Sequence, residues 1–319
     1  MIIPAKNAQA TIGRAVASAL AEPEAEQVLV IDDGSTDATA EAAREAACGS
    51  ERLFVRSLPA SVGPAAARNL AIALSAAPWI CPLDADDFFQ PGRLGRLLDQ
   101  ADGCDFVADD LLMVRQGAEA GPMRRVIGAR EPLPITLGFS DFLEANVSRP
   151  GMPRREYGFL KPLMRRDFLA DRGLAYNEGL RLGEDVILYS AALALGAVFK
   201  VVPPCGYVAV ERADSLSGRH TTQDLRALRD ASAGLGRLPG LSPRELLAVR
   251  RHVRHLQAKV DLREVLDARR AAGVAGGLLV LAARARSAPY IFARMAEDKL
   301  SARRAAAQAP RTGALVSRF

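Results

Sequence analysis

The amino-acid sequence predicts an α/β fold: a Rossmann-like, mostly parallel sheet flanked by helices, with a helical extension at the C-terminus. Short apolar runs, typical of strands buried on both faces, alternate with helical patterns over about the first 110 residues. The connections between these segments are short, as in successive βα units. From residue 242 onward, apolar positions instead step by three and four along an arginine-rich amphipathic helix.

Strands and helices are expected to alternate along the first part of the chain, in the order typical of a parallel sheet. The expected strands are residues 1–4, 27–31, 53–58, 79–83 and 106–108. Helices are expected to follow Thr11, the Asp32–Asp37 segment, Gly63-Pro64 and Pro91. Ser35 or Thr36 is suited to cap the second of these helices, and Pro91 is suited to the first turn of the fourth.

The second part of the chain is less regular. Residues 111–153 predict loops around a short helix at 139–145, and residues 157–163 predict an extended segment. A helix is expected at 165–171. A second, apolar helix follows Gly183 and ends at Gly196, and strands are expected at 198–202 and 207–210.

Polar side chains gather where the expected strands end. Lys6 and Asn7 follow the first strand, Asp33 follows the second, and the segment Asp84-Ala85-Asp86-Asp87 follows the fourth. The carboxyl ends of parallel strands meet at one edge of a sheet, so this edge is the expected ligand site. Clustered carboxylates repel one another unless a cation neutralises them, which indicates a divalent-metal site. A polar turn with helix-capping aspartates is the alternative.

Two familiar nucleotide motifs are missing from this edge. No G-x-G-x-x-G follows the first strand, and the chain has no G-x-x-x-x-G-K-[ST] segment. The four cysteines are scattered, without a C-x-x-C pair, which argues against a zinc ribbon and fits a reducing compartment. Together with a start that lacks a signal-peptide pattern, this predicts a cytoplasmic protein.

Charge is distributed unevenly along the chain. Residues 241–319 hold 16 of the 42 Lys and Arg residues but only 6 of the 37 Asp and Glu residues. The expected partner of this basic region is anionic, either the inner face of the cell membrane, bound peripherally, or a phosphate-bearing acceptor, and no nucleic acid is expected. A packed helical hairpin with a solvated basic face is the alternative. Residues 274–283 are apolar but too few to span a bilayer.

Five segments occur in order along the chain: IIPAKNAQATIGRAVASAL, VIDDGSTDAT, GPAAARNLAI, PLDADDFFQPGRL and GEDVILYSAAL. Together they resemble family 2 glycosyltransferases of the GT-A fold, over roughly residues 1–215. The resemblance implies a nucleotide-sugar-binding βα half at 1–110 and an acceptor-binding and catalytic half at 111–220. Residues 221–319 are then a basic helical region whose tail, after residue 305, is expected to be disordered.

The resemblance also implies a nucleotide-sugar site. Its implied residues are Pro4, Lys6, Asn7, Asp33, Gly63, Arg68, Asp84 and Arg212. Pro4 and Lys6 would flank the uracil and ribose, although tyrosine is usual in the family at the position of Lys6. Asp33 would hydrogen-bond the nucleobase, and the guanidinium of Arg68 suits a diphosphate because it is planar and permanently charged. Helix capping by Asp33 and a surface position for Arg68 are the alternatives.

Metal and catalytic residues follow from the same resemblance. Asp86 is the first implied ligand of Mg²⁺ or Mn²⁺, with Asp87 and His220 beside it. The pair Glu184-Asp185 would supply the catalytic base, with Asp185 taking the proton of the acceptor hydroxyl. An acidic pair stabilised by a helix N-terminus is the alternative. In-line displacement at the anomeric carbon would invert its configuration.

The sequence therefore predicts a metal-dependent, inverting transferase that moves one sugar from a UDP-sugar to a saccharide or lipid-linked saccharide of exopolysaccharide or lipopolysaccharide assembly. The chain has neither Q-x-x-R-W nor an apparent transmembrane helix, which favours single addition over processive synthesis. A nucleotidyltransferase on a similar sheet is one alternative, although the first strand lacks a glycine-rich loop. A non-catalytic scaffold of a polysaccharide assembly complex is another.

Overall fold

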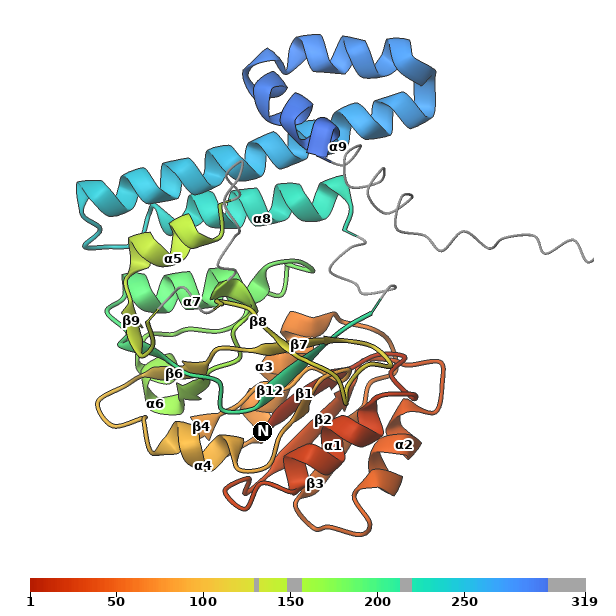
Figure 1. Ribbon diagram of the computed structural model, residues 1–319, viewed down its shortest axis with the longest axis vertical. Helices are drawn as coiled ribbons and strands as arrows, with labels where there is room; N and C mark the ends of the chain where they lie inside the picture. Colours follow the sequence, from red (N-terminus) through yellow and green to blue (C-terminus); the bar gives the residue numbers. More distant parts are fainter. Residues whose placement is uncertain (129–131, 148–156, 213–219, 298–319) are drawn as a thin grey trace, which may run out of the picture. The chain divides into compact units, whose positions relative to one another are not determined.

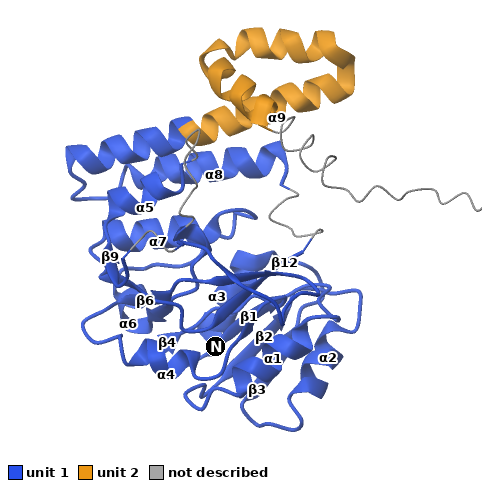
Figure 2. Ribbon diagram, viewed as in Figure 1, with its two compact units in different colours: residues 1–254 blue, residues 255–319 orange. Residues whose placement is uncertain are grey.

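The computed structural model describes residues 1–128, 132–147, 157–212 and 220–297 of the chain (Figure 1). The chain forms two compact units, Met1–Arg254 and His255–Phe319 (Figure 2). The unit boundary falls within a helix, and the predicted start of the C-terminal region at residue 221 lies inside the first unit. No helix among the described residues is both long enough and apolar enough to cross a bilayer. The predicted disordered tail lies outside the described residues.

Three parallel strands begin the central sheet: β1 (Ile2–Ala5), β2 (Val28–Asp32) and β3 (Leu53–Ser57), in the order β1-β2-β3. On its other side β1 meets the chain just after β4 (Trp79–Ile80), where Ile2 forms a parallel bridge with Pro82. The amide of Ile2 donates to the Cys81 carbonyl over 2.9 Å, and the amide of Leu83 donates to the Ile2 carbonyl over 3.0 Å. These bonds join the first three strands to the strands that follow.

The sheet continues from β4 in the order β4-β10-β6-β11-β9. The further strands are β6 (Phe106–Asp109), β9 (Ile135–Leu137), β10 (Leu163–Arg165) and β11 (Phe199–Val202). Only β10 and β9 run antiparallel to their described neighbours, so the sheet is mostly parallel, as predicted. Because β10 enters between β4 and β6, the residues just before it lie at the edge where those two strands end.

Helices cover the first strands as expected for βα units. They are α1 (Ile12–Leu20), α2 (Thr39–Ala46), α3 (Pro64–Leu74) and α4 (Arg93–Leu98). Right-handed crossovers place α1 and α2, which contact each other, on one face of the sheet (Figure 1). The strand order reverses between β1 and β4, so α3 returns the chain across the other face. Such a reversal is where ligands bind in open α/β sheets.

A smaller sheet carries the segment after the Asp84–Asp87 motif. Its order is β5-β12-β7-β8, with β5 (Phe88–Phe89), β7 (Leu112–Arg115), β8 (Arg124–Arg125) and β12 (Tyr207–Glu211). Three of the strands in the two sheets, β7, β8 and β9, fall where the sequence predicts loops, at 111–153. They are too short for alternation of polar and apolar residues to reveal them.

The remaining helices of the described chain follow β8. They are α5 (Phe139–Ala145), α6 (Arg166–Asp171), α7 (Glu184–Ala194), α8 (Thr222–Leu235) and α9 (Pro243–Ala283), with short 3₁₀ turns at Tyr157–Phe159 and Ala285–Ser287. Helix α7 contacts both α5 and α8 (Figure 1). Helix α9 is interrupted at Ala272 and Gly273, whose backbone angles are not helical. The sequence does not predict α8.

A buried aromatic cluster fixes α7 against the sheet. Phe106 of β6, Phe199 of β11, Phe142 of α5 and Tyr189 of α7 have ring centroids 5.4 to 6.5 Å apart. Each of these rings is fully buried. Aromatic rings bury more apolar area than other side chains, so this cluster anchors the helix whose first turn carries Glu184 and Asp185.

Three local predictions were wrong. Helix α2 begins at Thr39, directly after Ala38, so neither Ser35 nor Thr36 caps it; the side chains of both bond to Asn7 in the loop after β1 instead. Pro91 precedes α4, since Gly92 takes a left-handed conformation (φ 77°) as the residue before the first turn. The segment at 157–163 starts as a 3₁₀ turn and becomes a strand only at Leu163.

Candidate active site

The loops after the first three strands are tied together at the predicted edge. Asn7 has a left-handed backbone (φ 48°). Its side-chain Oδ1 accepts a 2.8 Å hydrogen bond from the Thr36 backbone amide, and its backbone amide donates to Ser35 Oγ over 2.9 Å. Gly34 also has a positive φ, of 65°, and a Cβ there would lie 2.7 Å from the amide nitrogen of Ser61. Only glycine permits this close approach of the two loops.

Asp33 lies at the same edge and is buried. Its carboxylate accepts hydrogen bonds from Ser61 Oγ (2.7 Å), the Val62 amide (2.6 Å) and the Gly63 amide (3.0 Å). The structure therefore brings together two predicted nucleotide-sugar residues, Asp33 and Gly63, and Asp33 orients the segment that begins α3. Recognition of a nucleobase by Asp33 stays a prediction.

Five charged side chains form what we call the carboxylate–cation cluster: Arg68, Asp84, Lys161, Glu184 and Asp185. The guanidinium of Arg68 donates to Glu184 Oε1 over 2.6 Å and to Asp84 Oδ1 over 2.8 Å. Lys161 Nζ lies 2.7 Å from Asp185 Oδ2 and 2.9 Å from Asp84 Oδ2. Both cations thus connect the end of β4 to the start of α7.

Burial and charge oppose each other within the cluster. Burial disfavours a charged Lys161, but the Asp185 and Asp84 carboxylates outweigh it and raise the lysine's pKa above its usual value. Burial also acts against a charged Asp84, yet Lys161 and Arg68 hold its pKa well below the usual range. The pKa of Arg68 is raised as well, because nearby carboxylates overcome its desolvation. These three groups are therefore all charged at neutral pH.

Two buried atoms of the cluster have no hydrogen-bond partner among the described residues. They are Asp185 Oδ1 and Arg68 Nε. Buried polar atoms are nearly always paired in folded proteins, and exceptions concentrate at sites that bind or react with something else. The orphan atoms therefore support a functional role for this cluster beyond holding α7 in place.

Asp87 belongs to a different arrangement, on the smaller sheet. Its oxygens accept 2.8 Å hydrogen bonds from the Tyr207 hydroxyl and from the Val210 amide of β12. Burial and the neighbouring charges of Asp84 and Asp86 raise the pKa of Asp87 to about 8. Because both of its oxygens are already hydrogen-bonded within the smaller sheet, Asp87 is better suited to a structural role than to the predicted metal ligation.

Asp86 is the carboxylate that best fits a metal ion. It is half-buried, and no other residue of the described chain donates a hydrogen bond to its side chain. Burial and the charge of Asp84 raise its pKa, so a cation beside it would relieve an unfavourable charge. The described residues contain no cluster of three or more metal-ligating side chains. This donor set fits Mg²⁺ or Mn²⁺ bound through one carboxylate and the phosphates of a nucleotide.

The remaining predicted site residues lie outside the carboxylate–cation cluster. The charge of Arg212 partly opposes the rise in the pKa of Asp86, whereas His220 acts electrostatically on Asp224 at the start of α8. Pro4 lies in β1 beside Ile31 of β2, and Lys6 is exposed just beyond that strand. The segment between Arg212 and His220 lies outside the described residues.

Sequence reasoning missed Lys161 and Tyr207. Lys161 stands in the apolar segment Phe159-Leu160-Lys161-Pro162-Leu163, and a lone lysine in such a run is the one sequence signal that marks it. Tyr207 looks like any strand residue, yet its hydroxyl donates to Asp87 and accepts from the Asp84 amide over 3.2 Å. Only the pairing of β12 with β5 makes that visible.

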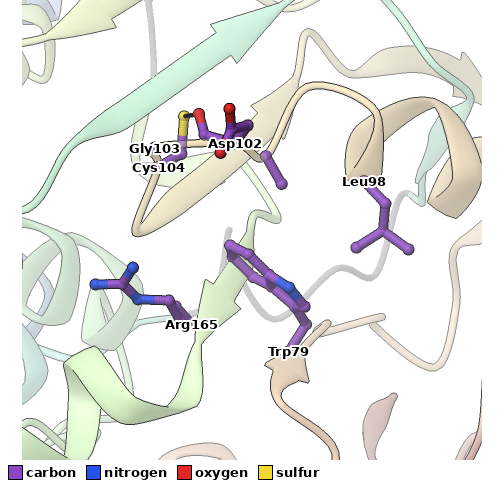
Figure 3. Close-up of a pocket in the computed structure, with 7 residues that line it drawn as sticks. Trp79, Leu98, Asp102, Gly103, Cys104 and Arg165 are labelled. Atoms are coloured by element: carbon purple, nitrogen blue, oxygen red, sulfur yellow. Dashed lines mark hydrogen bonds between the residues drawn. The ribbon is translucent and has the colours of Figure 1, made fainter.

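A shallow hollow of about 400 Å³ lies elsewhere (Figure 3). Its lining residues are Trp79, Leu98, Ala101, Asp102, Gly103, Cys104 and Arg165. They stand at the start of β4, at the end of α4, just before β6 and at the end of antiparallel β10, which is the opposite edge of the sheet from the cluster. No predicted site residue lines this hollow.

Comparison with known proteins identifies the family of this chain. The sequence profile of glycosyl transferase family 2 matches residues 1–151. The succinoglycan biosynthesis protein ExoU of Rhizobium meliloti (strain 1021) is 54% identical over 267 residues, which cover 84% of this chain and 78% of that protein. The chain belongs to glycosyl transferase family 2. It is therefore a glycosyltransferase, which favours sugar transfer over the nucleotidyl-transfer alternative.

Further similarities agree with this family. The succinoglycan biosynthesis protein ExoO of the same organism is 37% identical over 220 residues, covering 68% of this chain and 61% of that protein. A crystal structure of S. aureus TarS 1–349 with UDP-GlcNAc matches with a TM-score of 0.61 at 18% identity, over 89% of this chain and 90% of that one. The mannosyltransferase PcManGT of Pyrobaculum calidifontis, in complex with GDP-Man and Mn²⁺, matches with a TM-score of 0.53 at 16% identity, over 92% and 78%. The predicted GT-A fold is confirmed.

Proposed function

We propose that this glycosyltransferase moves one sugar from a UDP-sugar to a saccharide acceptor, with inversion, during assembly of an extracellular polysaccharide. The observation that carries the proposal is the carboxylate–cation cluster, which lies at the strand-order reversal beside β1 and β4. The names of ExoU and ExoO support the polysaccharide. The TarS complexes with UDP and UDP-GlcNAc support the donor class.

In this proposal the two ends of the cluster have separate tasks. Asp84 lies on the donor side, and Asp86, two residues later in the chain, would bind Mg²⁺ or Mn²⁺ together with the diphosphate. When bound, that cation neutralises the charge that develops on the leaving diphosphate. Asp185 at the start of α7 takes the proton of the acceptor hydroxyl, whose pKa is too high for it to ionise unaided. Attack from the side opposite the leaving group inverts the anomeric carbon.

Turnover by the purified chain tests this function. A panel of UDP-sugars with Mn²⁺ and saccharide acceptors is expected to yield a product one sugar longer, identified by mass spectrometry. Asp185→Asn is expected to lower kcat by about 10³-fold, since it removes a general base, while UDP binding by calorimetry stays within about threefold. Asp102→Asn, exposed at the opposite edge of the sheet, is the matched control.

The outcomes separate the enzyme from the scaffold alternative. A wild-type chain that neither turns over nor binds any UDP-sugar contradicts the proposal. Chelation of divalent ions is expected to abolish turnover and to spare the fold, measured by circular dichroism. Undiminished turnover after chelation would disprove metal dependence while leaving glycosyl transfer intact.

We also propose that the acceptor is lipid-linked and that the second unit contacts an anionic membrane surface. Helix α9 exposes Val274, Leu278 and Leu279 by 64%, 59% and 76%. Arg269 and Arg286 are exposed before and after this apolar stretch. Exposed apolar side chains near arginines suit the boundary between anionic headgroups and acyl chains.

Vesicle sedimentation tests the membrane contact. The chain is expected to sediment with vesicles that contain anionic phosphatidylglycerol and to stay in solution with phosphatidylcholine vesicles. The double variant Leu278→Ser and Leu279→Ser is expected to lose at least about tenfold in vesicle affinity, because two apolar side chains no longer enter the interface. Binding unaffected by this change would contradict the assignment of the surface.

A further inference from the structure

Lys161 contacts both carboxylates that the proposed reaction uses. Its side chain is only 7% exposed, and its Nζ lies 2.7 Å from Asp185 Oδ2 and 2.9 Å from Asp84 Oδ2. The two carboxylates depend on it unequally. Asp84 also pairs with Arg68. Among the described residues, Lys161 is the one hydrogen-bond partner of the Asp185 carboxylate, whose Oδ1 has none.

The backbone at Lys161 is fixed independently of these contacts. The carbonyl of Lys161 accepts a 2.7 Å hydrogen bond from Arg93, whose fully buried guanidinium also pairs with Asp109 over 2.8 Å. Two residues later the chain enters β10, which is hydrogen-bonded to β4 on one side and β6 on the other. The ammonium group is therefore presented from a rigid part of the sheet, a condition for positioning another side chain closely.

We propose that Lys161 is a positioning residue, which holds the Asp185 carboxylate at a set place relative to Asp84 and thereby aligns the base with the donor sugar. The inference rests on the proposed function and adds a residue to it. Misplacement of a catalytic group by about 1 Å can cost about a hundredfold in rate. Loss of Lys161 would free the Asp185 side chain, whereas Asp84 would still be held by Arg68.

The experiment compares Lys161→Gln with wild type. We expect kcat to fall by about a hundredfold, while the KM of the UDP-sugar and the affinity for UDP stay within about threefold. Lys161→Arg keeps the charge, and we expect its kcat to lie between those of Lys161→Gln and wild type. Lys200→Gln is the matched control and should behave as wild type, because Lys200 is a half-buried lysine on β11 that bonds Gln100 and lies away from the cluster.

The results decide the matter in either direction. A kcat of Lys161→Gln near that of wild type, or equal losses in kcat and donor affinity, overturns the proposal. If Lys161→Gln does not fold, Lys161→Arg carries the test: a lower kcat at unchanged donor KM supports the proposal, and an unchanged kcat overturns it.

A crystal structure of the variant provides a readout that does not depend on turnover. In Lys161→Gln, or in Lys161→Arg if the first does not fold, Asp185 is expected to adopt a new side-chain conformation, while Asp84 stays against Arg68. An unmoved Asp185 overturns the positioning role even if the enzyme is active. Conversely, a moved Asp185 in the variant, together with a wild-type chain that transfers no sugar, refutes the proposed function and leaves the positioning of Asp185 by Lys161 standing.

Discussion

Arg68 and Glu184 are 116 positions apart in sequence, yet Nη1 of the arginine lies 2.6 Å from Oε1 of the glutamate. The same guanidinium bonds Asp84 over 2.8 Å, and its side chain is only 5% exposed. Arg68 therefore connects α3 to both the end of β4 and the start of α7. The sequence predicts Arg68 beside a diphosphate, whereas in the structure two carboxylates already use its outer nitrogens.

Arg68→Met is expected to lower the free energy of unfolding by about 3–5 kcal/mol, because it leaves the buried Glu184 carboxylate without its charged partner and Asp84 with Lys161 alone. Chemical denaturation measures this change. Arg165→Met is the control: Arg165 is 46% exposed and pairs with Asp105, so its loss should cost about 1 kcal/mol or less. Similar stabilities for the two variants would show that Arg68 is not structural and would favour a direct role toward the nucleotide.

Asp86 and Asp87 are adjacent but are expected to respond differently to substitution. Asp86→Asn should abolish the Mn²⁺ dependence of turnover and lower kcat by about a hundredfold or more, with little change in stability, because no other residue of the described chain donates to its carboxylate. Asp87→Asn should cost about 1–3 kcal/mol of stability, since it disturbs the bonds to Tyr207 and Val210. Metal titration and thermal unfolding of both variants distinguish metal binding by Asp86 from structural hydrogen bonding by Asp87. If Asp87→Asn instead lost the metal dependence and Asp86→Asn lost stability, the two roles would be reversed.

Gly183 begins the helix that carries the acidic pair, with a φ of 73°. A Cβ there would lie 2.7 Å from a methyl carbon of Leu228 on α8. Backbone strain alone is expected to lower the free energy of unfolding by about 1–3 kcal/mol, and Gly183→Ala should lower it by more because of the contact with Leu228. The variant should also lower kcat, because it displaces Glu184 and Asp185. Gly196→Ala, at the other end of α7 with a φ of 91° and open space around it, isolates the strain. Equal losses of activity in the two variants would contradict the argument.

Helix α8 begins with a capping box between Thr221 and Asp224. The Asp224 amide donates to Thr221 Oγ1 over 3.1 Å, and the Thr221 amide donates to the Asp224 carboxylate over 2.7 Å. Thr221→Ala is expected to lower the free energy of unfolding by about 1 kcal/mol, measured by denaturant titration at neutral pH.

The pH dependence of this contribution has a defined sign. Slight burial disfavours the charged form, but hydrogen bonds from Thr221 lower the pKa of Asp224 below its model-peptide value of 3.8. The stabilisation is therefore present above about pH 4 and is lost as the pH falls through the lower folded-state pKa. The difference in free energy of unfolding between wild type and Asp224→Asn should therefore shrink as the pH falls below about 4. A difference that grows as the pH falls would contradict this prediction.

Much of the edge that carries the site follows from sequence alone. The apolar runs identify β1, β2, β4 and β6, whose residues are mostly buried, because strands buried on both faces must be apolar throughout. Once those strands are parallel, the polar residues after them must share an edge. That is why Asp33, Asp84 and Asp86 were predicted together with no knowledge of their contacts.

Other features were beyond sequence reasoning for physical reasons. Strands β5 and β8 have two residues each, too few for any periodicity. The expected cap of α2 failed because Ser35 and Thr36 bond to Asn7, a partner distant in sequence whose approach only the fold determines.

By itself, the sequence determined which chemical groups this protein has and at which edge of the sheet most of them stand. The tertiary structure alone decided how they pair. Entry of β10 between β4 and β6 places Lys161 between Asp84 and Asp185, and the pairing of β12 with β5 turns Asp87 toward Tyr207. Local propensities extend over a few residues, whereas these contacts join segments up to 120 positions apart, so only the assembled sheets create them.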